Sequence, residues 1–244
     1  LLSRRQRQMC IRDSNKTEAI TLEQSKLTLS KDITVLSFSD SSMVDRNSSI
    51  IKVDSGWIVY SKNSESSILS FTSDGQFSGY IGHRGNGPGE YTSVYDVVVN
   101  QKSKVLEVLS DGGIFCYTFG GDFLDKKEVT YPAFSFAIDD RQNYWFYVGN
   151  NTTYGDAKMI CTDENIANVA YYLHQKSNML PMVENNFGRN GEWLTFHESL
   201  NHDLYTIENG KLDLSYAMDF PNYKLPKNCL LYTSPSPRDT ERSR

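Results

Sequence analysis

The chain has little cysteine and no extended hydrophobic run, and these shortages exclude several classes of protein. Only 4 of its 244 residues are cysteine. No Cys-x-x-C spacing occurs, so the sequence indicates neither a zinc knuckle nor a redox pair. No apolar run approaches the about 18–20 residues that a membrane-spanning helix requires. No long segment shows helical periodicity either, which leaves short β-strands as the expected elements.

Motifs that mark common enzyme sites are also missing. The four histidines never occur with His-Glu-x-x-His or His-x-His spacing, and there is no Gly-x-Ser-x-Gly nucleophile motif. The glycine-rich segment of the chain is not followed by Gly-Lys-Ser/Thr, as a phosphate-binding loop would be. The sequence therefore predicts no catalytic residue, no metal ligand and no cofactor.

The two ends differ from the interior in charge and composition. Residues 1–14 carry four Arg and one Asp, a net +3, and residues 229–244 carry three Arg, one Asp and one Glu, a net +1. Neither segment fits a strand pattern, and both resemble translated sequencing adapter, so we expect non-native tails at 1–14 and 229–244. Genuine basic, disordered tails are the alternative. Without these segments the formal charge of −5 becomes −9 for residues 15–228, which disfavours nucleic acid and anionic membrane surfaces as partners.

The interior contains a repeat with a period in the forties. The segment from Ile68 to Phe77 aligns without a gap with the segment from Ile114 to Phe123, an offset of 46 residues, and related positions follow at Ile160 and Leu204. Each unit has short β-branched and aromatic runs separated by turn residues, and Asp74-Gly75 suits a tight hairpin. Such a repeat is typical of β-propeller blades.

The predicted fold is therefore all-β: a partial β-propeller over residues 15–228 with four-stranded antiparallel blades. The length accommodates about four blades, which we expect to form an open arc of a larger ring. Strand alternation places Cys116 and Cys161 on opposite faces, so we expect two buried thiols without a bridge. Alternate members of the aromatic run Tyr144–Tyr147 are expected to face the neighbouring blade and to fill the wedge between the sheets.

The most distinctive local sequence is the glycine-rich segment from Gly82 to Tyr91. Its glycines permit close backbone approach, and consecutive N–H groups together with Arg84 form a potential anion-holding nest. The alternative is a structural link between blades that is pinned by its own turns, with Arg84 and Glu90 paired locally. The candidate binding residues are His83, Arg84, Gly85, Gly87, Glu90 and Tyr91.

One run of residues carries a resemblance to a known family. Phe71-x-x-x-Gly75-x-Phe77, followed by Ile81-Gly-x-x-Gly85-x-Gly87-Pro-Gly-Glu90-Tyr91, resembles the NHL-like repeat, and more narrowly the six-bladed β-propeller proteins of Bacteroides and its relatives. The segment from Leu204 to Pro226 is similar to a later blade of that family. The resemblance implies a ring of six blades, of which about four are present. It also implies export to the periplasm or cell surface, often as a lipoprotein, and assigns no activity.

The leading functional hypothesis is a non-enzymatic, exported binding or scaffolding module whose ligand is a glycan or a protein. It rests on the repeat, the aromatic content of 12% and the acidic interior. The alternative is a propeller hydrolase or lyase with a metal ion in the central channel. Its candidate ligands are carboxylates near inner strands, namely Asp54, Asp96, Asp139 and Glu192. A purely structural module within a larger assembly is a third possibility.

Overall fold

The computed structural model describes residues 33–38, 44, 48–62, 67–149, 157–167, 169–174, 185–191, 193–198 and 203–217. These residues form strands, turns and connecting segments, and none of them belongs to a helix, membrane-spanning or otherwise, so the predicted all-β class is confirmed. The described blades belong to a compact unit that spans Thr34–Tyr216. The predicted tails at 1–14 and 229–244 lie outside the described residues.

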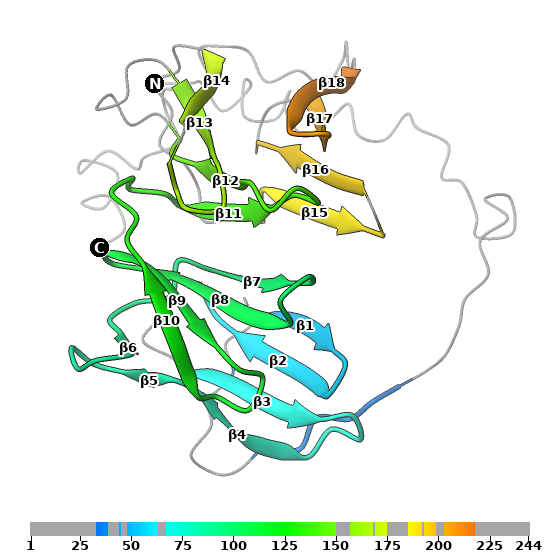
Figure 1. The fold of residues 1–244 in the computed structure, drawn as a ribbon. Coiled ribbons are helices and arrows are strands. Elements are labelled where there is room, and N and C mark those ends of the chain that lie inside the picture. Colours follow the sequence, from blue (N-terminus) through cyan, green and yellow to red (C-terminus); the bar gives the residue numbers. More distant parts are fainter. Residues whose placement is uncertain are drawn as a thin grey trace, which may run out of the picture. The chain divides into compact units, whose positions relative to one another are not determined.

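Four antiparallel sheets of four consecutive strands each form the blades of a β-propeller (Figure 1). Blade 1 contains β1 (Ser49–Val53), β2 (Gly56–Tyr60), β3 (Ile68–Thr72) and β4 (Phe77–Ile81). Blade 2 contains β7 (Asp96–Asn100), β8 (Val105–Ser110), β9 (Gly113–Tyr117) and β10 (Phe123–Lys127). Blade 3 contains β11 (Ser135–Ile138), β12 (Tyr144–Tyr147), β13 (Ala157–Thr162) and β14 (Ala170–His174). Blade 4 contains β15 (Phe187–Asn190), β16 (Trp193–His197), β17 (Asp203–Glu208) and β18 (Lys211–Ala217).

The sequence repeat corresponds to the third strand of each blade. Ile68 lies in β3, Ile114 in β9, Ile160 in β13 and Leu204 in β17. The β3–β4 hairpin turns at Asp74-Gly75 as predicted, with Gly75 at φ +88°, a conformation that suits a residue without a Cβ. The predicted blade pattern is thus confirmed, whereas a total of six blades and an open arc stay predictions.

Alternating side chains of one strand join blade 3 to both of its neighbours. Tyr144 and Phe146 of β12 belong to the hydrophobic cluster shared with blade 2, and Trp145 and Tyr147 belong to the cluster shared with blade 4. All four side chains are buried. Because successive residues of a strand point to opposite faces, one aromatic run fills the space between three sheets. This confirms the role predicted for these aromatic residues.

Each of the three interfaces between successive blades also contains a carboxylate grouped with a lysine and a tyrosine. Between blades 1 and 2, Lys62 Nζ lies 2.8 Å from Asp96 Oδ1, and both side chains are 8% exposed. The Tyr60 hydroxyl donates to the same oxygen at 3.4 Å, and the Phe136 N–H of blade 3 donates to the other at 3.1 Å. Burial raises the pKa of Asp96, and the Lys62 ammonium opposes that rise.

The other two interfaces use the same three residue types. Between blades 2 and 3 the Tyr144 hydroxyl donates to Glu107 Oε2 at 2.8 Å, and Lys127 Nζ donates to the Tyr144 oxygen. Buried charged groups are tolerated only when they are paired and hydrogen-bonded, as they are in these clusters. Between blades 3 and 4 the carboxylate of Glu198 lies 2.7 Å from the Tyr147 hydroxyl and 2.8 Å from Lys158 Nζ.

The two described cysteines should be chemically inert. Cys116 and Cys161 are free and buried, as predicted, and they pack into different clusters on opposite sides of blade 3. Burial raises the pKa of each thiol to about 12. Because the thiolate is the reactive form, we expect iodoacetamide to leave both residues unmodified in the native protein at neutral pH.

Peptide mass spectrometry after alkylation checks this expectation. The same reagent applied to the urea-unfolded chain is the positive control and should label both residues. Rapid labelling of either cysteine in the native protein would contradict the burial of the two thiols.

Candidate functional site

The glycine-rich segment forms a compact link between blades 1 and 2, in which β5 (His83–Arg84) and β6 (Glu90–Tyr91) pair in parallel. The Gly87 N–H donates to the Glu90 carboxylate at 2.8 Å. A Cβ on Gly85 would lie 2.0 Å from Glu90 Oε2. The two glycines therefore make room for a carboxylate that belongs to the segment itself.

Two further predicted residues are held within the same link. Tyr91 is fully buried, and its hydroxyl donates to the Ile81 carbonyl at 3.2 Å. Arg84 Nε donates to the Thr92 carbonyl at 2.8 Å. Of the six predicted residues, His83 and Arg84 are exposed, while the other four are buried or partly buried in the link. An anion-binding role for this segment stays a prediction.

The carboxylates of the metal-enzyme alternative do not gather at one point. Asp54 is an exposed turn residue 3.2 Å from Lys104 Nζ, and Asp96 is buried between blades 1 and 2. Asp139 accepts hydrogen bonds within the β11–β12 turn, and Glu192 lies outside the described residues. Within the described part of the chain, no three His, Cys, Asp or Glu side chains are placed to hold a metal ion.

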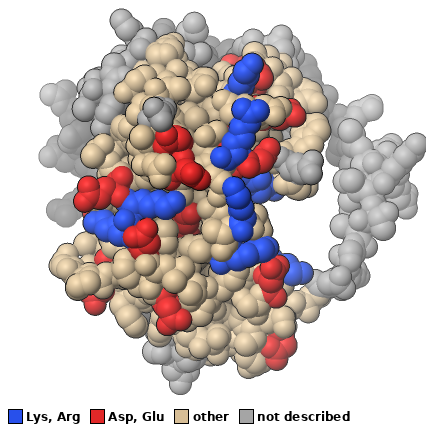
Figure 2. All heavy atoms as spheres, in the orientation of Figure 1, with Lys and Arg blue, Asp and Glu red and all other residues tan. Residues whose placement is uncertain are grey.

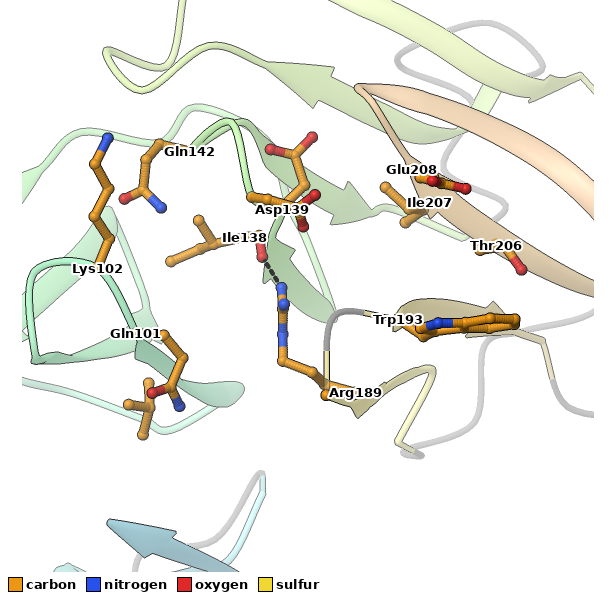
Figure 3. A pocket seen from close by; sticks show the side chains of 13 residues that line it. Gln101, Lys102, Ile138, Asp139, Gln142, Arg189, Trp193, Thr206, Ile207 and Glu208 are labelled. Carbon is orange, nitrogen blue, oxygen red and sulfur yellow. Dashed lines mark hydrogen bonds between the residues drawn. The ribbon is translucent and has the colours of Figure 1, made fainter. Parts of the chain in front are cut away.

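A cavity of about 1070 Å³, here called the mouth pocket, opens beside the turns that follow the innermost strands of blades 2, 3 and 4. The β7–β8 turn, the β11–β12 turn and the β15–β16 turn each contribute to its wall, together with the end of β17. Figure 3 shows side chains from these separate elements facing one space. Its lining includes the polar and aromatic residues Gln101, Lys102, Gln142, Arg189, Trp193 and Glu208.

The mouth pocket and the glycine-rich link lie at opposite ends of the inner strand of blade 2. That strand, β7, begins at Asp96, shortly after Tyr91 of the link, and ends at Asn100, next to Gln101 of the pocket. None of the six predicted binding residues is among the described residues that line the pocket. The structure therefore offers a second candidate site, distinct from the one that the sequence suggested.

Trp193 is the large aromatic side chain on the pocket wall. It begins β16 and is 65% exposed, whereas Leu194 and Phe196 of the same strand are buried against blade 3. Strand alternation accordingly places the indole on the opposite face from these two residues. Figure 3 shows it on the same side of the cavity as Thr206 and Glu208. An exposed tryptophan in a cavity wall is a common anchor for a ligand.

Arg189 stands at the boundary of two cavities. It lies in β15 and lines both the mouth pocket and a smaller cavity of about 340 Å³ that runs along the inner strands. Its guanidinium reaches from blade 4 to blade 3, where Nη2 donates to the Ile138 carbonyl (Figure 3). Arg189 is an exposed residue, and this hydrogen bond orients its guanidinium in the pocket wall.

The charge around the site is of both signs. Lys102 and Arg189 line the mouth pocket together with Asp139, Asp140 and Glu208. Figure 2 likewise shows Lys and Arg side chains in a column down the viewed face, with acidic side chains beside them. The expected absence of nucleic-acid and anionic membrane partners stays a prediction.

Sequence reasoning missed the mouth pocket because its residues are scattered along the chain. Asp139, a candidate of the metal-enzyme alternative, does line the pocket. Trp193 also had a usable signal, since it alternates with two apolar residues and so faces away from the core. Arg189 lies on Phe187–Asn190, a strand that was not predicted because its Gly, Arg and Asn residues are poor β-formers. Gln101 and Gln142 are turn residues, and nothing in their local sequence distinguishes them from other turn residues.

Comparison with known protein families finds one match over most of the chain. A family profile with the description "Domain of unknown function (DUF4934)" matches residues 11–244. No curated protein matches the sequence.

Solved structures resemble the fold at low sequence identity. A Bacteroides fragilis protein described as exported is 14% identical over 77% of this chain and 55% of its own, with a TM-score of 0.66. A DUF4221 family member from Bacteroides vulgatus is 10% identical over 79% of this chain and 63% of its own, with a TM-score of 0.54. A streptogramin B lyase is 16% identical over 75% of this chain and 58% of its own, with a TM-score of 0.51. The chain thus spans 55 to 63% of these structures, and the likeness concerns the fold alone.

Proposed function

The chain belongs to the DUF4934 family, and we propose that it is a non-enzymatic binding module whose mouth pocket takes a glycan. One observation carries this proposal: Trp193, 65% exposed, forms part of the wall of a cavity of about 1070 Å³ whose lining combines polar side chains with the aliphatic Val99, Ile138 and Ile207. A site with an aromatic surface and several hydrogen-bonding groups suits a sugar ring, which has an apolar C–H face and a rim of hydroxyls.

The chemistry of the lining supports a sugar over an apolar ligand. The amides of Gln101 and Gln142 each offer a donor and an acceptor, and the Thr206 hydroxyl offers both in one atom. Glu208 adds a carboxylate acceptor on the side where Trp193 lies (Figure 3). Sugar hydroxyls require this mixture of donors and acceptors, whereas the indole supplies the stacking surface.

An extracytoplasmic location is part of the proposal. The Bacteroides fragilis neighbour is described as exported, and the NHL-like motif from Phe71 to Tyr91 resembles proteins of the periplasm or cell surface. Export as a lipoprotein and a six-bladed ring, both implied by that resemblance, belong to the same proposal. A protein ligand in place of a glycan is an outcome that the following test can reveal.

Replacing Trp193 with alanine is expected to weaken glycan binding about thirtyfold, the effect of losing one aromatic anchor of about 2 kcal/mol. A glycan array identifies the ligand, and isothermal titration calorimetry on the purified full chain measures its affinity for wild type and variant. Tyr171→Ala removes another exposed aromatic side chain, 46% exposed and outside the pocket, and should leave the affinity unchanged.

Two results would overturn the proposal. If no glycan on the array binds, and pull-down experiments instead recover a protein partner, the ligand is a protein and the glycan proposal is wrong. If Trp193→Ala and Tyr171→Ala bind the glycan as tightly as wild type does, the mouth pocket is not the site. Circular dichroism of both variants establishes that each is folded.

A further inference from the structure

Arg189 places a positive charge in the wall of the mouth pocket, and a neutral sugar has no negative group to pair with it. Its hydrogen-bond acceptor is the neutral carbonyl of Ile138. In the described part of the chain Arg189 forms no ion pair with a carboxylate. The guanidinium is thus held in position in a cavity wall with its charge uncompensated by a direct partner.

The nearest acidic residue along β11 does not supply that partner. Asp139 follows Ile138, but its Oδ1 accepts the backbone N–H groups of Arg141 and Asn143, each at 2.9 Å. Its Oδ2 accepts the Asn143 side-chain amide at 2.9 Å and the Trp145 indole N–H at 3.0 Å. Both carboxylate oxygens therefore accept hydrogen bonds from the β11–β12 turn and from Trp145, and neither forms an ion pair with Arg189 in the described part of the chain.

Building on the glycan-binding proposal above, we propose that the ligand is an acidic glycan whose carboxylate, a uronic acid group, is bound by Arg189 while Trp193 stacks on the sugar ring. A guanidinium presents a rigid planar fork of N–H donors that matches a planar carboxylate in two parallel hydrogen bonds. Because the Ile138 carbonyl already positions the side chain, little conformational entropy is lost when the ligand binds.

The other charged residues of the pocket limit how much negative charge a bound ligand can carry. Lys102 lines the pocket and adds a second positive charge, but Asp139, Asp140 and Glu208 line it as well. These carboxylates repel a ligand with closely spaced anionic groups, such as a polyphosphate or a heavily sulfated chain. The site therefore suits a glycan with an isolated carboxylate rather than a polyanion.

The test compares oligosaccharides that differ only at one terminal sugar. Calorimetry on the full chain measures the affinity for an oligosaccharide ending in glucuronic acid, for the same oligosaccharide ending in glucose, and for its singly sulfated counterpart. We expect wild type to prefer the uronate over glucose by about tenfold or more. The preference should fall to about one in Arg189→Gln and to an intermediate value in Arg189→Lys, which keeps the charge and loses the planar fork.

Arg141→Gln is the matched control. Arg141 lies in the neighbouring β11–β12 turn, bonds to Asn209 and is outside the pocket lining, so its loss should leave the uronate preference intact. Circular dichroism shows whether each variant is folded, and Arg189→Lys provides a second reading if Arg189→Gln is not.

The outcomes separate this inference from the proposed function. If wild type binds the uronate and glucose forms equally, or the sulfated form as tightly as the uronate, the acidic-glycan inference is wrong while glycan binding stands. A uronate preference that survives in Arg189→Gln refutes the role of Arg189. Failure of every oligosaccharide on the array and in calorimetry to bind refutes glycan binding itself.

Discussion

Asp96→Ala is expected to lower the free energy of unfolding by about 3–5 kcal/mol, the cost of removing one partner of a buried ion pair. The substitution takes the carboxylate away from Lys62 Nζ, 2.8 Å distant, in a place where both side chains are 8% exposed. It also removes the acceptor of the Phe136 N–H, which Asp96 binds at 3.1 Å across the blade 2–3 boundary. Urea denaturation followed by circular dichroism measures the change.

An exposed ion pair in the same fold provides the control. Asp54 and Lys104 lie 3.2 Å apart with side chains 82% and 54% exposed, so Asp54→Ala should change the free energy of unfolding by less than about 1 kcal/mol. Equal effects of the two substitutions would show that burial of the Asp96 cluster contributes nothing. The comparison therefore tests whether the tyrosine, lysine and carboxylate clusters between blades stabilise the fold.

Gly56→Ala should be similarly damaging, at about 4 kcal/mol or more, because it combines a strained backbone with a direct overlap. Gly56 begins β2 at φ +151°, and a Cβ there would lie 2.0 Å from the Phe71 carbonyl oxygen of β3. That oxygen belongs to the backbone of a strand paired on both sides, so it cannot move without breaking the sheet. Thermal and urea unfolding of the purified variant measure the loss.

Gly79→Ala separates the effect of backbone strain from the effect of steric overlap. Gly79 has nearly the same backbone angle, φ +154°, yet a Cβ there would meet nothing within 4 Å. Its cost should therefore be the conformational strain alone, about 1–3 kcal/mol. If Gly79→Ala destabilises as much as Gly56→Ala does, the close approach of β2 and β3 is not the reason that Gly56 is glycine.

The glycine-rich segment shows why sequence alone leaves two interpretations of such a motif open. Its glycines and Arg84 suggest an anion site, which stays a prediction, and Gly85 and Gly87 make room for the Glu90 carboxylate, which accepts the Gly87 N–H at 2.8 Å. Tyr91 is buried between blades and bonds to the Ile81 carbonyl. Packing demands of a link between sheets can produce the same residue types as a binding loop, because both require backbone to approach closely.

The sequence by itself determined the parts of this protein that depend on the neighbouring residues along the chain. Strand spacing, hairpin turns and the two-residue alternation of side chains are properties of a local backbone, so the repeat from Ile68 to Leu204 located the third strand of every blade. The same alternation correctly assigned members of Tyr144–Tyr147 to the space between blades, and placed Cys116 and Cys161 on different faces.

Only the tertiary structure decided which distant side chains meet. Tyr147 and Glu198 are 51 residues apart in the chain and join in one partly buried cluster, and Arg189 reaches across a blade interface to the Ile138 carbonyl. Such meetings depend on how sheets pack and on the reach of long side chains, which no local pattern encodes. The mouth pocket combines turns of three blades with a strand of weak β-propensity. The local sequence therefore could not indicate that these residues line one cavity.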